Sequence, residues 1–336
     1  KNTEYDLDSD IQEMREIREN ERLGPSTGCI VQEAVNRNIP FIRLNKHSLV
    51  QLGYGINQKR IQATVSSTTS NIAVEIACDK EETKNLLHAN AIPVAKGDII
   101  RRESSLESVV KELGYPLVIK PFNGNHGRGI TIDIRNWEDA LKGFHAAKEK
   151  SNSVIIERYV EGRDFRVLVI NYKFVAASLR TPAAVTGDGK STIQDLIDNV
   201  NSDPRRGYGH EKVLTLITVN QMTKDILSKI GLALDSVIEK DKTIYLKNTA
   251  NLSTGGTATD FTDNVHPYNI FMAERISRII GLDICGIDIM AEDLSKPLNE
   301  NGGVVLEVNA GPGFRMHIAP TEGLARNIAE PVIDML

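Results

Sequence analysis

The sequence has few cysteines, because only Cys29, Cys78 and Cys285 occur among its 336 residues. Their odd number and wide spacing exclude a disulfide framework and a CxxC-type metal site. We expect all three side chains to be small, buried hydrophobic groups. The lack of a disulfide pattern also favours a reducing compartment, so we expect a cytoplasmic protein.

Long apolar runs and a surplus of positive charge are absent as well. The apolar runs are no longer than a strand, so the sequence offers no candidate for a membrane-spanning helix. The formal net charge of −5 gives no excess of cations for phosphates, and we do not expect nucleic acid as a partner. Residues 1–10 have neither the basic start nor the apolar centre of a signal peptide. Because the first residue is Lys1 rather than Met, we expect the chain to begin inside a longer protein.

What is present is the composition of an ordinary globular protein. With 40% hydrophobic and 25% charged residues, a chain of this length can form two or three compact units. Residues 1–72 read as helices followed by a strand and a hairpin, a small α/β piece without visible chemistry. Residues 73–336 form a second domain, with an inserted segment at about 181–253 that is rich in Gly, Pro, Asn and Asp.

The second domain is predicted to be α+β, with mixed or antiparallel sheets and helices on one face. A hairpin is predicted at Asn171-Tyr172, because apolar runs flank these two residues. The predicted helices cover residues 79–89, 104–113, 136–148, 192–200, 220–230, 269–280 and 322–335. The predicted strands cover residues 92–99, 116–122, 130–134, 154–160, 166–170, 174–179, 284–290 and 303–309.

A lysine and a glycine-rich loop end one of the apolar strands. Lys120 lies near the end of the run 116–122, and Gly124, Gly127 and Gly129 follow it. A cation beside approachable backbone N–H groups is what nucleotide phosphates require. A glycine-rich turn beside a surface lysine explains this pattern equally well when it is taken alone.

Carboxylates follow a second apolar strand. Glu157 comes directly after the run 154–156, and Asp164 lies beyond Gly162. The end of such a strand can pair with the amino edge of adenine, while a second carboxylate can reach the ribose hydroxyls. The alternative is an acidic strand end exposed to solvent.

A third group of oxygen-bearing side chains lies on two strands near the C-terminus. The alternation of side chains places Glu307 and Asn309 on one face of a strand, and Asp288 on a neighbouring strand can join them. These oxygens suit Mg²⁺, which would bridge to phosphates. Carboxylates on an exposed sheet face are the ordinary alternative, although residues 284–287 and 304–306 are apolar or glycine.

The stretch 187–192, Gly-Asp-Gly-Lys-Ser-Thr, ends like a phosphate-binding P-loop. However, Ala184 stands where the first glycine of that motif belongs, and no buried strand leads directly into the stretch. We therefore interpret it as a substrate-contacting loop.

Taken in order, these groups resemble the ATP-grasp enzymes, in which two α+β subdomains hold ATP between them. Six strings resemble cyanophycin synthetase more specifically, and this resemblance runs from about Leu23 to the end of the chain. It implies that residues 1–72 are the C-terminal part of that family's N-terminal domain and that residues 73–336 are the ATP-grasp domain. The strings lie at 79–84, 120–130, 180–189, 203–207, 252–256 and 307–317. Members of that family continue into a Mur-ligase-like module, which we expect in the full-length protein.

The resemblance implies a ligase that activates the C-terminal carboxylate of a peptide or polymer primer and joins aspartate to it. The implied cofactors are ATP and Mg²⁺, and the family precedent is a homo-oligomer. The implied nucleotide-binding residues are Lys80, Lys120, Asn123, Gly124, His126, Gly127, Arg128, Gly129, Glu157, Val160 and Asp164. The implied metal ligands are Asp288, Glu307 and Asn309.

Arginine has a permanent charge and a forked set of donors, which suits a carboxylate or a developing oxyanion. We predict these catalytic roles for Arg166, Arg180 and Arg315, assisted by His317. Further substrate contacts are predicted at Arg206, His210, Ser253, Thr254, Gly255 and Gly256. The two alternatives are a glutathione-synthetase-like or other amino-acid ligase, and a nucleotide-binding module without turnover.

Overall fold

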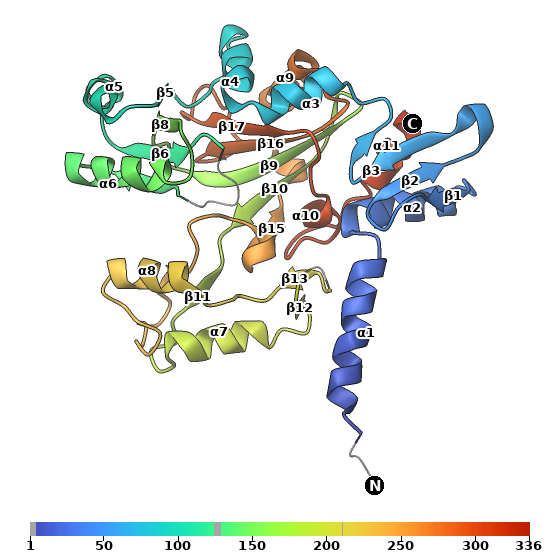
Figure 1. Cartoon of the computed structure of the whole chain (residues 1–336), viewed down its shortest axis with the longest axis horizontal. Coiled ribbons are helices and arrows are strands. Elements are labelled where there is room, and N and C mark those ends of the chain that lie inside the picture. The colour runs from blue at the N-terminus through green and yellow to red at the C-terminus, as the bar shows by residue number, and fades with distance from the viewer. Residues whose placement is uncertain (1–4, 124–128, 210) are drawn as a thin grey trace.

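A computed structural model gives the fold of the chain and describes residues 5–123, 129–209 and 211–336. Figure 1 shows a central sheet, with a smaller sheet and its helices on one side and an N-terminal unit on the other. Residues 181–253 form a further group of helices and short strands below the central sheet in this view. No helix in the described ranges is long and apolar enough to cross a membrane.

The N-terminal unit comprises residues 5–70. Its helices are α1 (Leu7–Glu21), α2 (Pro25–Asn36) and the short η1 (Gly55–Asn57). Its antiparallel sheet consists, in spatial order, of β1 (Phe41–Arg43), β2 (Leu49–Leu52), β3 (Lys59–Gln62) and β4 (Val65–Ser66), which confirms the predicted strand and hairpin. Helix α1 points away from the rest of the molecule (Figure 1), and the apolar side chains of Leu7, Met14 and Ile17 on it are exposed.

The smaller sheet is antiparallel and has the spatial order β5 (Gly97–Ile100), β8 (Val154–Arg158), β6 (Leu117–Pro121) and β7 (Thr131–Ile134). The helices α5 (Leu106–Leu113), preceded by η2 (Glu103–Ser105), and α6 (Trp137–Lys148) cover one face. Leu117 and Ile156 point into the core beneath these helices. Because side chains alternate along a strand, Lys120 and Glu157 point to the opposite face.

The central sheet is also antiparallel, with the spatial order β15 (Thr257–Asp260), β10 (Lys173–Thr181), β9 (Arg163–Ile170), β16 (Ile284–Ala291) and β17 (Val304–Asn309). The predicted hairpin between β9 and β10 is confirmed. Asn171 and Tyr172 have φ angles of 51° and 59°, as a tight two-residue hairpin turn requires.

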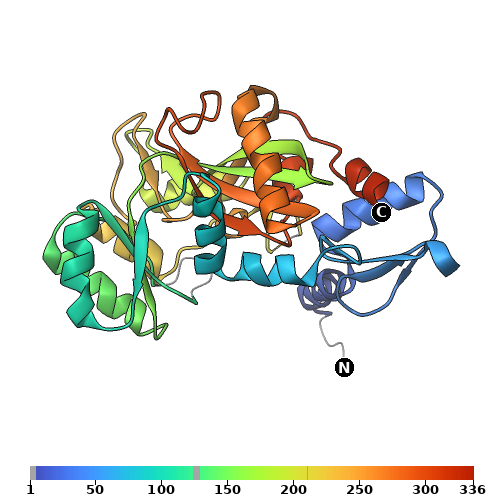
Figure 2. The same cartoon turned by 90° about the horizontal axis from the view of Figure 1, so that it is seen from above.

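The two faces of the central sheet have different neighbours. One face packs against α3 (Asn71–Cys78), α4 (Lys80–Ala89) and α9 (Pro267–Ile280), as Figure 2 shows from above. On the other face, Leu168, Ile170 and Ile284 pack against α2 and α11 (Ala329–Met335). Beyond this contact, the second face carries charged side chains, among them Arg166 and Asp288. The N-terminal unit therefore covers only one end of this face, and the other end is polar.

The cysteines differ in their environments. Cys285 is buried in the central core, Cys29 is half-buried, and Cys78 at the end of α3 is exposed. The expectation of three buried side chains is therefore wrong for Cys78, because α3 turns its last residue to solvent. Helix α3 itself was not predicted from the sequence.

Residues 181–253 contain β11 (Ala184–Thr186), α7 (Ile193–Asn201), β12 (Arg206–Gly207), β13 (Leu214–Thr215), α8 (Gln221–Lys229), β14 (Thr243–Tyr245) and η3 (Leu252–Thr254). This segment has its own hydrophobic cluster, which includes Val185, Ile197, Leu227 and Leu246. The helices α7 and α8 lie within one residue of their predicted bounds at each end.

The C-terminal helix is shorter than predicted. After η4 (Thr262–Asn264) and the core strands, α10 (Arg315–Ile318) is followed by irregular backbone, and α11 begins only at Ala329. Asp260 donates its backbone N–H to the carbonyl of Glu322 (2.9 Å), and Gly323 has a φ of 89°. The predicted helix over 322–335 therefore begins too early. Residue 322 instead pairs with Thr259 of the edge strand β15, which requires an extended backbone.

Candidate active site

Charged side chains from four neighbouring strands share one face of the central sheet. The strand register places Arg166 opposite both Ser178 and Asp288, and it places Asp288 opposite Glu307. Two residues further along β17, Asn309 lies opposite Gly286. The register thus brings Asp288, Glu307 and Asn309 together on one side of β16 and β17, as the sequence pattern predicts.

Two arginines neutralise the carboxylates at the centre of this face. Arg166 binds both carboxylate oxygens of Asp288, with Nη2 at 3.0 Å from Oδ2. Arg180 Nη2 lies 2.5 Å from Asp164 Oδ1 and 3.0 Å from Asp288 Oδ2. The Arg166 and Arg180 side chains are only 10% and 9% exposed, so this is a buried network rather than a surface ion pair.

The network determines which groups are charged. Burial alone would raise the pKa of Asp288, but the charges of Arg166 and Arg180 outweigh burial and leave this pKa below its ordinary value. The pKa of Asp164 is instead raised, because burial and the neighbouring Asp288 carboxylate outweigh the attraction of Arg180. Asp288 is therefore the firmly ionised member of the network.

A second charged cluster joins α4 to the smaller sheet. Glu157 on β8 accepts from Lys84 Nζ (2.7 Å) and from Lys120 Nζ (2.5 Å). Burial would raise the pKa of Glu157, but the two ammonium groups outweigh it and lower the pKa. Gly97 permits this packing, since an added Cβ would lie 2.6 Å from the Glu157 side chain.

Replacing Glu157 by Gln should destabilise the protein by about 2–3 kcal/mol near pH 7, because two half-buried ammonium groups lose their counter-ion. A lowered pKa in the folded state stabilises the protein above the ordinary pKa of 4.5, and this contribution disappears as the pH falls through the lowered value. Urea unfolding at pH 7 and at a pH below the lowered pKa of Glu157 should therefore show a difference between variant and parent only at pH 7.

The matched control for this substitution is Glu107→Gln. Glu107 forms an ion pair of the same length, 2.7 Å, with Lys111, but both side chains are exposed. Its loss should change stability less, because water screens exposed pairs. An equal effect of the two substitutions at pH 7 would contradict the assignment of Glu157 as a buried counter-ion.

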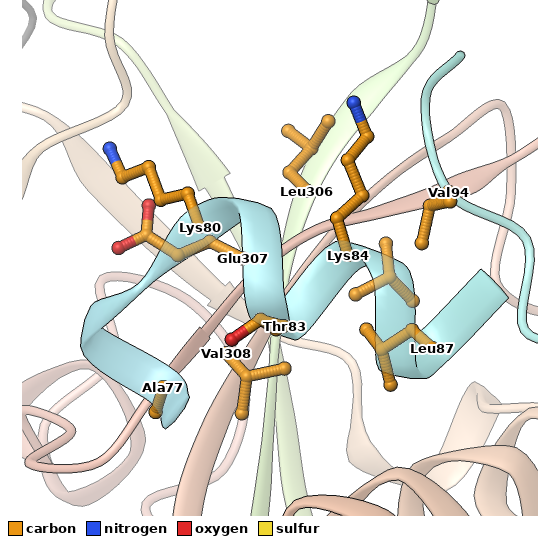
Figure 3. A pocket seen from close by; sticks show the side chains of 10 residues that line it. Ala77, Lys80, Thr83, Lys84, Leu87, Val94, Leu306, Glu307 and Val308 are labelled. Atoms are coloured by element: carbon orange, nitrogen blue, oxygen red, sulfur yellow. The ribbon is translucent and has the colours of Figure 1, made fainter. Parts of the chain in front are cut away.

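A small pocket lies between α4 and β17. Its lining includes Lys80, Thr83 and Lys84 from the helix and Glu307 from the strand. Figure 3 shows Lys80 and Lys84 extending from the same side of α4, with the Glu307 carboxylate on the Lys80 side. Asp79 caps this helix by accepting from the N–H groups of its first turn. The cap fixes where the two lysines, four residues apart, project.

The side-chain oxygens on β16 and β17 are of the type that a hard divalent cation binds, and those of Asp288 are bonded to Arg166 and Arg180 in this structure. Asn309 donates its amide N–H to the carbonyl of Gly286 (3.3 Å), which leaves its carbonyl oxygen as a ligand. In the described part of the chain, the Glu307 carboxylate has no ion-pair partner. The described residues contain no cluster of three His, Cys, Asp or Glu suited to a metal, and the set here has two carboxylates and an amide.

The third predicted arginine belongs to the segment after β17. Arg315 at the start of α10 donates to Thr215 Oγ1 (3.2 Å) and to the carbonyl of Gly209 (3.4 Å). Arg206 is buried and donates to the carbonyls of Thr215 (2.5 Å) and Gly255 (3.1 Å). In this conformation, Arg206 links the backbone of β13 to the turn after η3.

His317 is 2% exposed. Its Nδ1 atom forms a hydrogen bond with Ser178 Oγ (2.9 Å). Burial lowers its pKa to about 3, with a further contribution from Arg166, so the imidazole is neutral at pH 7. Its Nε2 atom is buried and has no partner among the described residues. This environment favours a role in holding α10 on β10 over direct contact with substrate.

The predicted substrate residues 253–256 form the end of η3 and the turn after it. Ser253 is exposed, and Thr254 donates to the carbonyl of Asn251 (3.0 Å). Gly255 has a φ of 94°, and an added Cβ on Gly256 would lie 2.8 Å from two carbonyl oxygens. Both glycines are thus explained by backbone conformation and packing.

Asn123 is exposed after β6, and Gly129 precedes β7. Val160 is half-buried just after β8. The predicted phosphate-binding residues Gly124, His126, Gly127 and Arg128 and the predicted substrate residue His210 lie outside the described residues.

The P-loop-like stretch is organised by its own aspartate. Asp188 accepts from the backbone N–H groups of Lys190 (2.8 Å) and Ser191 (2.7 Å), and these bonds lower its pKa to about 2. Thr192 donates its N–H to Asp195 (3.0 Å). In a P-loop, such N–H groups point toward phosphate, but here they donate to Asp188 and Asp195. This agrees with the interpretation that the stretch is not a P-loop.

The sequence analysis gave Lys84 no role in the site, although this residue lies in the stretch 79–84 that resembles cyanophycin synthetase. The available signal was its spacing of four residues from Lys80, which places both on one side of a helix. The structure pairs it with Glu157, a contact between residues 73 positions apart that no local pattern predicts.

The comparisons with known proteins agree with this geometry. Residues 82–190 match the family model described as the D-ala D-ala ligase C-terminus. The crystal structure of a bifunctional glutathione synthetase from Pasteurella multocida superposes with a TM-score of 0.70 at 29% identity, covering 94% of this chain and 43% of that protein. These similarities confirm the predicted ATP-grasp fold.

Within this class, the chain is similar over nearly its whole length to cyanophycin synthetases. It is 54% identical to the enzyme of that name from Synechocystis sp. over 334 residues, which cover 98% of this chain and 38% of the relative. A bifunctional glutathione biosynthesis protein from Clostridium perfringens is 31% identical over 94% of this chain and 41% of the relative. The chain therefore spans about two fifths of the length of these relatives, and the predicted resemblance to cyanophycin synthetase is confirmed.

Proposed function

We propose that this chain is an ATP-dependent carboxylate–amine ligase that adds aspartate to the C-terminus of a cyanophycin-like poly-aspartate backbone. The observation that carries the proposal is the buried network of Arg166, Asp288 and Arg180. It lies beside Glu307 and Asn309, at the end of the central sheet that carries charged side chains. Similarity to cyanophycin synthetases over 98% of the chain supports the choice of substrate.

The proposed reaction activates a carboxylate, which at neutral pH reacts poorly with amines because oxide would have to leave. An oxygen of the primer carboxylate attacks the γ-phosphorus of ATP, and ADP leaves. The aspartate amine then attacks the carbonyl carbon of the acyl phosphate, inorganic phosphate leaves, and the amine loses a proton. Positioning and charge neutralisation supply most of the catalysis in such transfers.

The charged groups at the site suit these steps. We assign phosphate contacts to Lys80, Lys84 and Lys120, together with the backbone of residues 123–129. Lys84 and Lys120 form ion pairs with Glu157 in this structure, so bound phosphates would either replace Glu157 as their partner or join the cluster. We assign Mg²⁺ to Asp288, Glu307 and Asn309, where the ion would supply positive charge between the phosphates.

The nucleoside is assigned to Glu157, Val160 and Asp164. Val160 lies two residues beyond the end of β8, so its backbone is outside the strand pairing. Asp164 binds Arg180 in this structure, and a ribose contact by Asp164 would exchange that ion pair for hydrogen bonds to hydroxyls.

The acceptor carboxylate is assigned to the arginines. Two anions, the primer carboxylate and the γ-phosphate, repel each other at contact unless a fixed cation lies beside them. Arg180 and Arg166 provide such cations on the polar face, and Arg315 is brought to the same end by α10.

A glutathione-synthetase-like ligase is the second candidate function. The similarity to glutathione synthetases at 29–31% identity favours it, and it shares the proposed nucleotide half of the site. The two candidates differ in the acceptor carboxylate and in the amino acid that is added.

ADP release should be stimulated by a poly-aspartate-type primer plus aspartate and Mg²⁺, and not by γ-glutamylcysteine plus glycine. The measurement is a coupled ADP assay with each pair of substrates, and mass spectrometry of the primer should show the added aspartate. Stimulation only by the glutathione precursors would replace the first candidate by the second. Controls without primer report any uncoupled ATP hydrolysis.

Two further features of the proposal concern assembly. The relatives are longer than this chain, and we propose a Mur-ligase-like module elsewhere in the full-length protein. We also propose a homo-oligomer as the working state. Size-exclusion chromatography with light scattering measures the latter directly.

A further inference from the structure

A short segment connects two residues of the proposed site. Asn309 ends β17, Arg315 begins α10, and between them lies Ala-Gly-Pro-Gly-Phe, residues 310–314, here called the connecting segment. Two glycines around a proline give a chain whose glycine dihedrals are little restricted. An added Cβ on Gly313 would meet nothing within 4 Å, so packing at that position does not restrict the backbone. The segment therefore needs contacts from elsewhere to hold one conformation.

Those contacts come from the N-terminal unit. Thr64, which is 1% exposed, donates its hydroxyl to the carbonyl of Pro312 (3.0 Å). Ser26 in the first turn of α2 accepts the backbone N–H of Phe314 through its Oγ (2.9 Å). The Phe314 ring is fully buried in the cluster that contains Ile30 of α2 and Ile61 of β3.

The N-terminal unit is itself fixed to the central sheet. Asp283, which lies directly before β16, accepts hydrogen bonds from the hydroxyls of Ser66 (3.1 Å), Thr68 (3.0 Å) and Thr69 (2.7 Å). The strand β16 carries Asp288 five residues further on. The unit is thus anchored at the start of the strand that bears one proposed metal ligand, and it holds the segment that follows another.

We propose that the N-terminal unit is a part of the active site, in which Ser26 and Thr64 are positioning residues for the connecting segment. This inference rests on the proposed ligase function of the site. The two hydroxyls fix the distance and direction between Asn309 and Arg315 by binding the backbone between them. A displacement of about 1 Å at a reacting centre can lower a rate by about a hundredfold, so small shifts of Arg315 matter.

Thr27 provides a matched control within the same unit. It is also a buried threonine, 2% exposed, and it donates its hydroxyl to a carbonyl, that of Ala63 (3.3 Å). Its partner belongs to the N-terminal unit rather than to the connecting segment. Valine replaces threonine with the same shape, so Thr64→Val and Thr27→Val each remove one buried hydroxyl bond at similar cost in stability.

The first test uses amide hydrogen exchange of residues 313–318 in the full chain without substrates. Thr64→Val and Ser26→Ala should speed this exchange by about tenfold, and Thr27→Val should leave it at the parent rate. Alanine favours the helix at Ser26, so loss of α2 is not the cause of any change there. Unchanged exchange in Thr64→Val, or equal acceleration in Thr27→Val, would overturn the proposal.

The second test measures ADP release with primer and aspartate. We expect Thr64→Val to lower kcat by about tenfold at unchanged KM for ATP, while Thr64→Ser, which keeps the hydroxyl, restores the parent kcat. Equal kcat values of Thr64→Val and Thr27→Val would overturn the positioning role even if both unfold at lower temperature. If the parent itself shows no primer-dependent turnover, the proposed function fails, and the exchange experiment still decides whether the unit holds the segment.

Discussion

Replacing Glu307 by Gln should abolish primer-dependent turnover, with a loss of at least about a hundredfold. Gln has nearly the same size but lacks the negative charge, and a hard divalent cation is bound mainly through charged oxygen ligands. Even residues that only orient metal ligands typically contribute about 10–100-fold, so a direct ligand should have a larger effect. Glu307 lies on the edge strand β17 opposite Asp288, whose ionised state is maintained by two arginines.

The fold should survive this substitution, because Glu307 is only half-buried and no ion pair of its carboxylate is present in the described ranges. The measurements are steady-state ADP release at increasing Mg²⁺ and thermal unfolding of the same sample. Glu300→Gln is the control, since Glu300 is exposed in the turn that leads into β17. Parent-like turnover in Glu307→Gln would remove this residue from the metal site.

Replacing Arg180 by Lys should reduce primer-dependent ADP release by about tenfold or more, each tenfold being about 1.4 kcal/mol of transition-state stabilisation. Lysine keeps the charge between Asp164 and Asp288 but loses the planar fork that reaches both carboxylates. The affinity for ATP should barely change, because the phosphate contacts are assigned to lysines of α4 and β6. The comparison requires ADP release with and without primer, and a separate titration with ATP.

Arg278→Lys is the matched control for Arg180→Lys. Arg278 pairs with Glu274 (3.8 Å) on the solvent side of α9, across the sheet from the polar face, and its loss should leave turnover intact. A simple surface ion pair at Arg180 would contribute under about 1 kcal/mol to stability, but its 9% exposure already excludes a surface location. If Arg180→Lys lowers the unfolding temperature while ADP release stays at the parent rate, Arg180 is structural and the acceptor assignment is wrong.

Local patterns predicted the elements that depend on neighbouring residues. The hairpin at Asn171-Tyr172 and the helices α7 and α8 could be placed because turn and capping preferences act over a few residues. The strand expected over 92–99 was misplaced because its first residues interact with a distant part of the chain. Val94 pairs with Val305 of β17, and regular strand begins only at Gly97, because a distant partner takes the first residues.

The same division applies to the site. The sequence by itself determined that Glu307 and Asn309 share a face, because side chains alternate along a strand, and that Lys80 and Lys84 share one side of a helix. It also carried the resemblance to the ATP-grasp enzymes, because the charged groups occur in the order seen in that family. These properties follow from spacing along the chain and do not depend on how the strands are paired.

Only the tertiary structure decided which partners these groups have. Glu157 meets Lys84 and Lys120, and Asp288 is shared by Arg166 and Arg180, because the packing of α4 and the antiparallel register of the strands bring together residues up to 122 positions apart. The contact of Thr64 with Pro312, 248 positions away, likewise depends on where the N-terminal unit packs. Pairings of this kind are set by the burial of apolar faces between separate units. That packing cannot be deduced from the positions of the charged residues in the sequence.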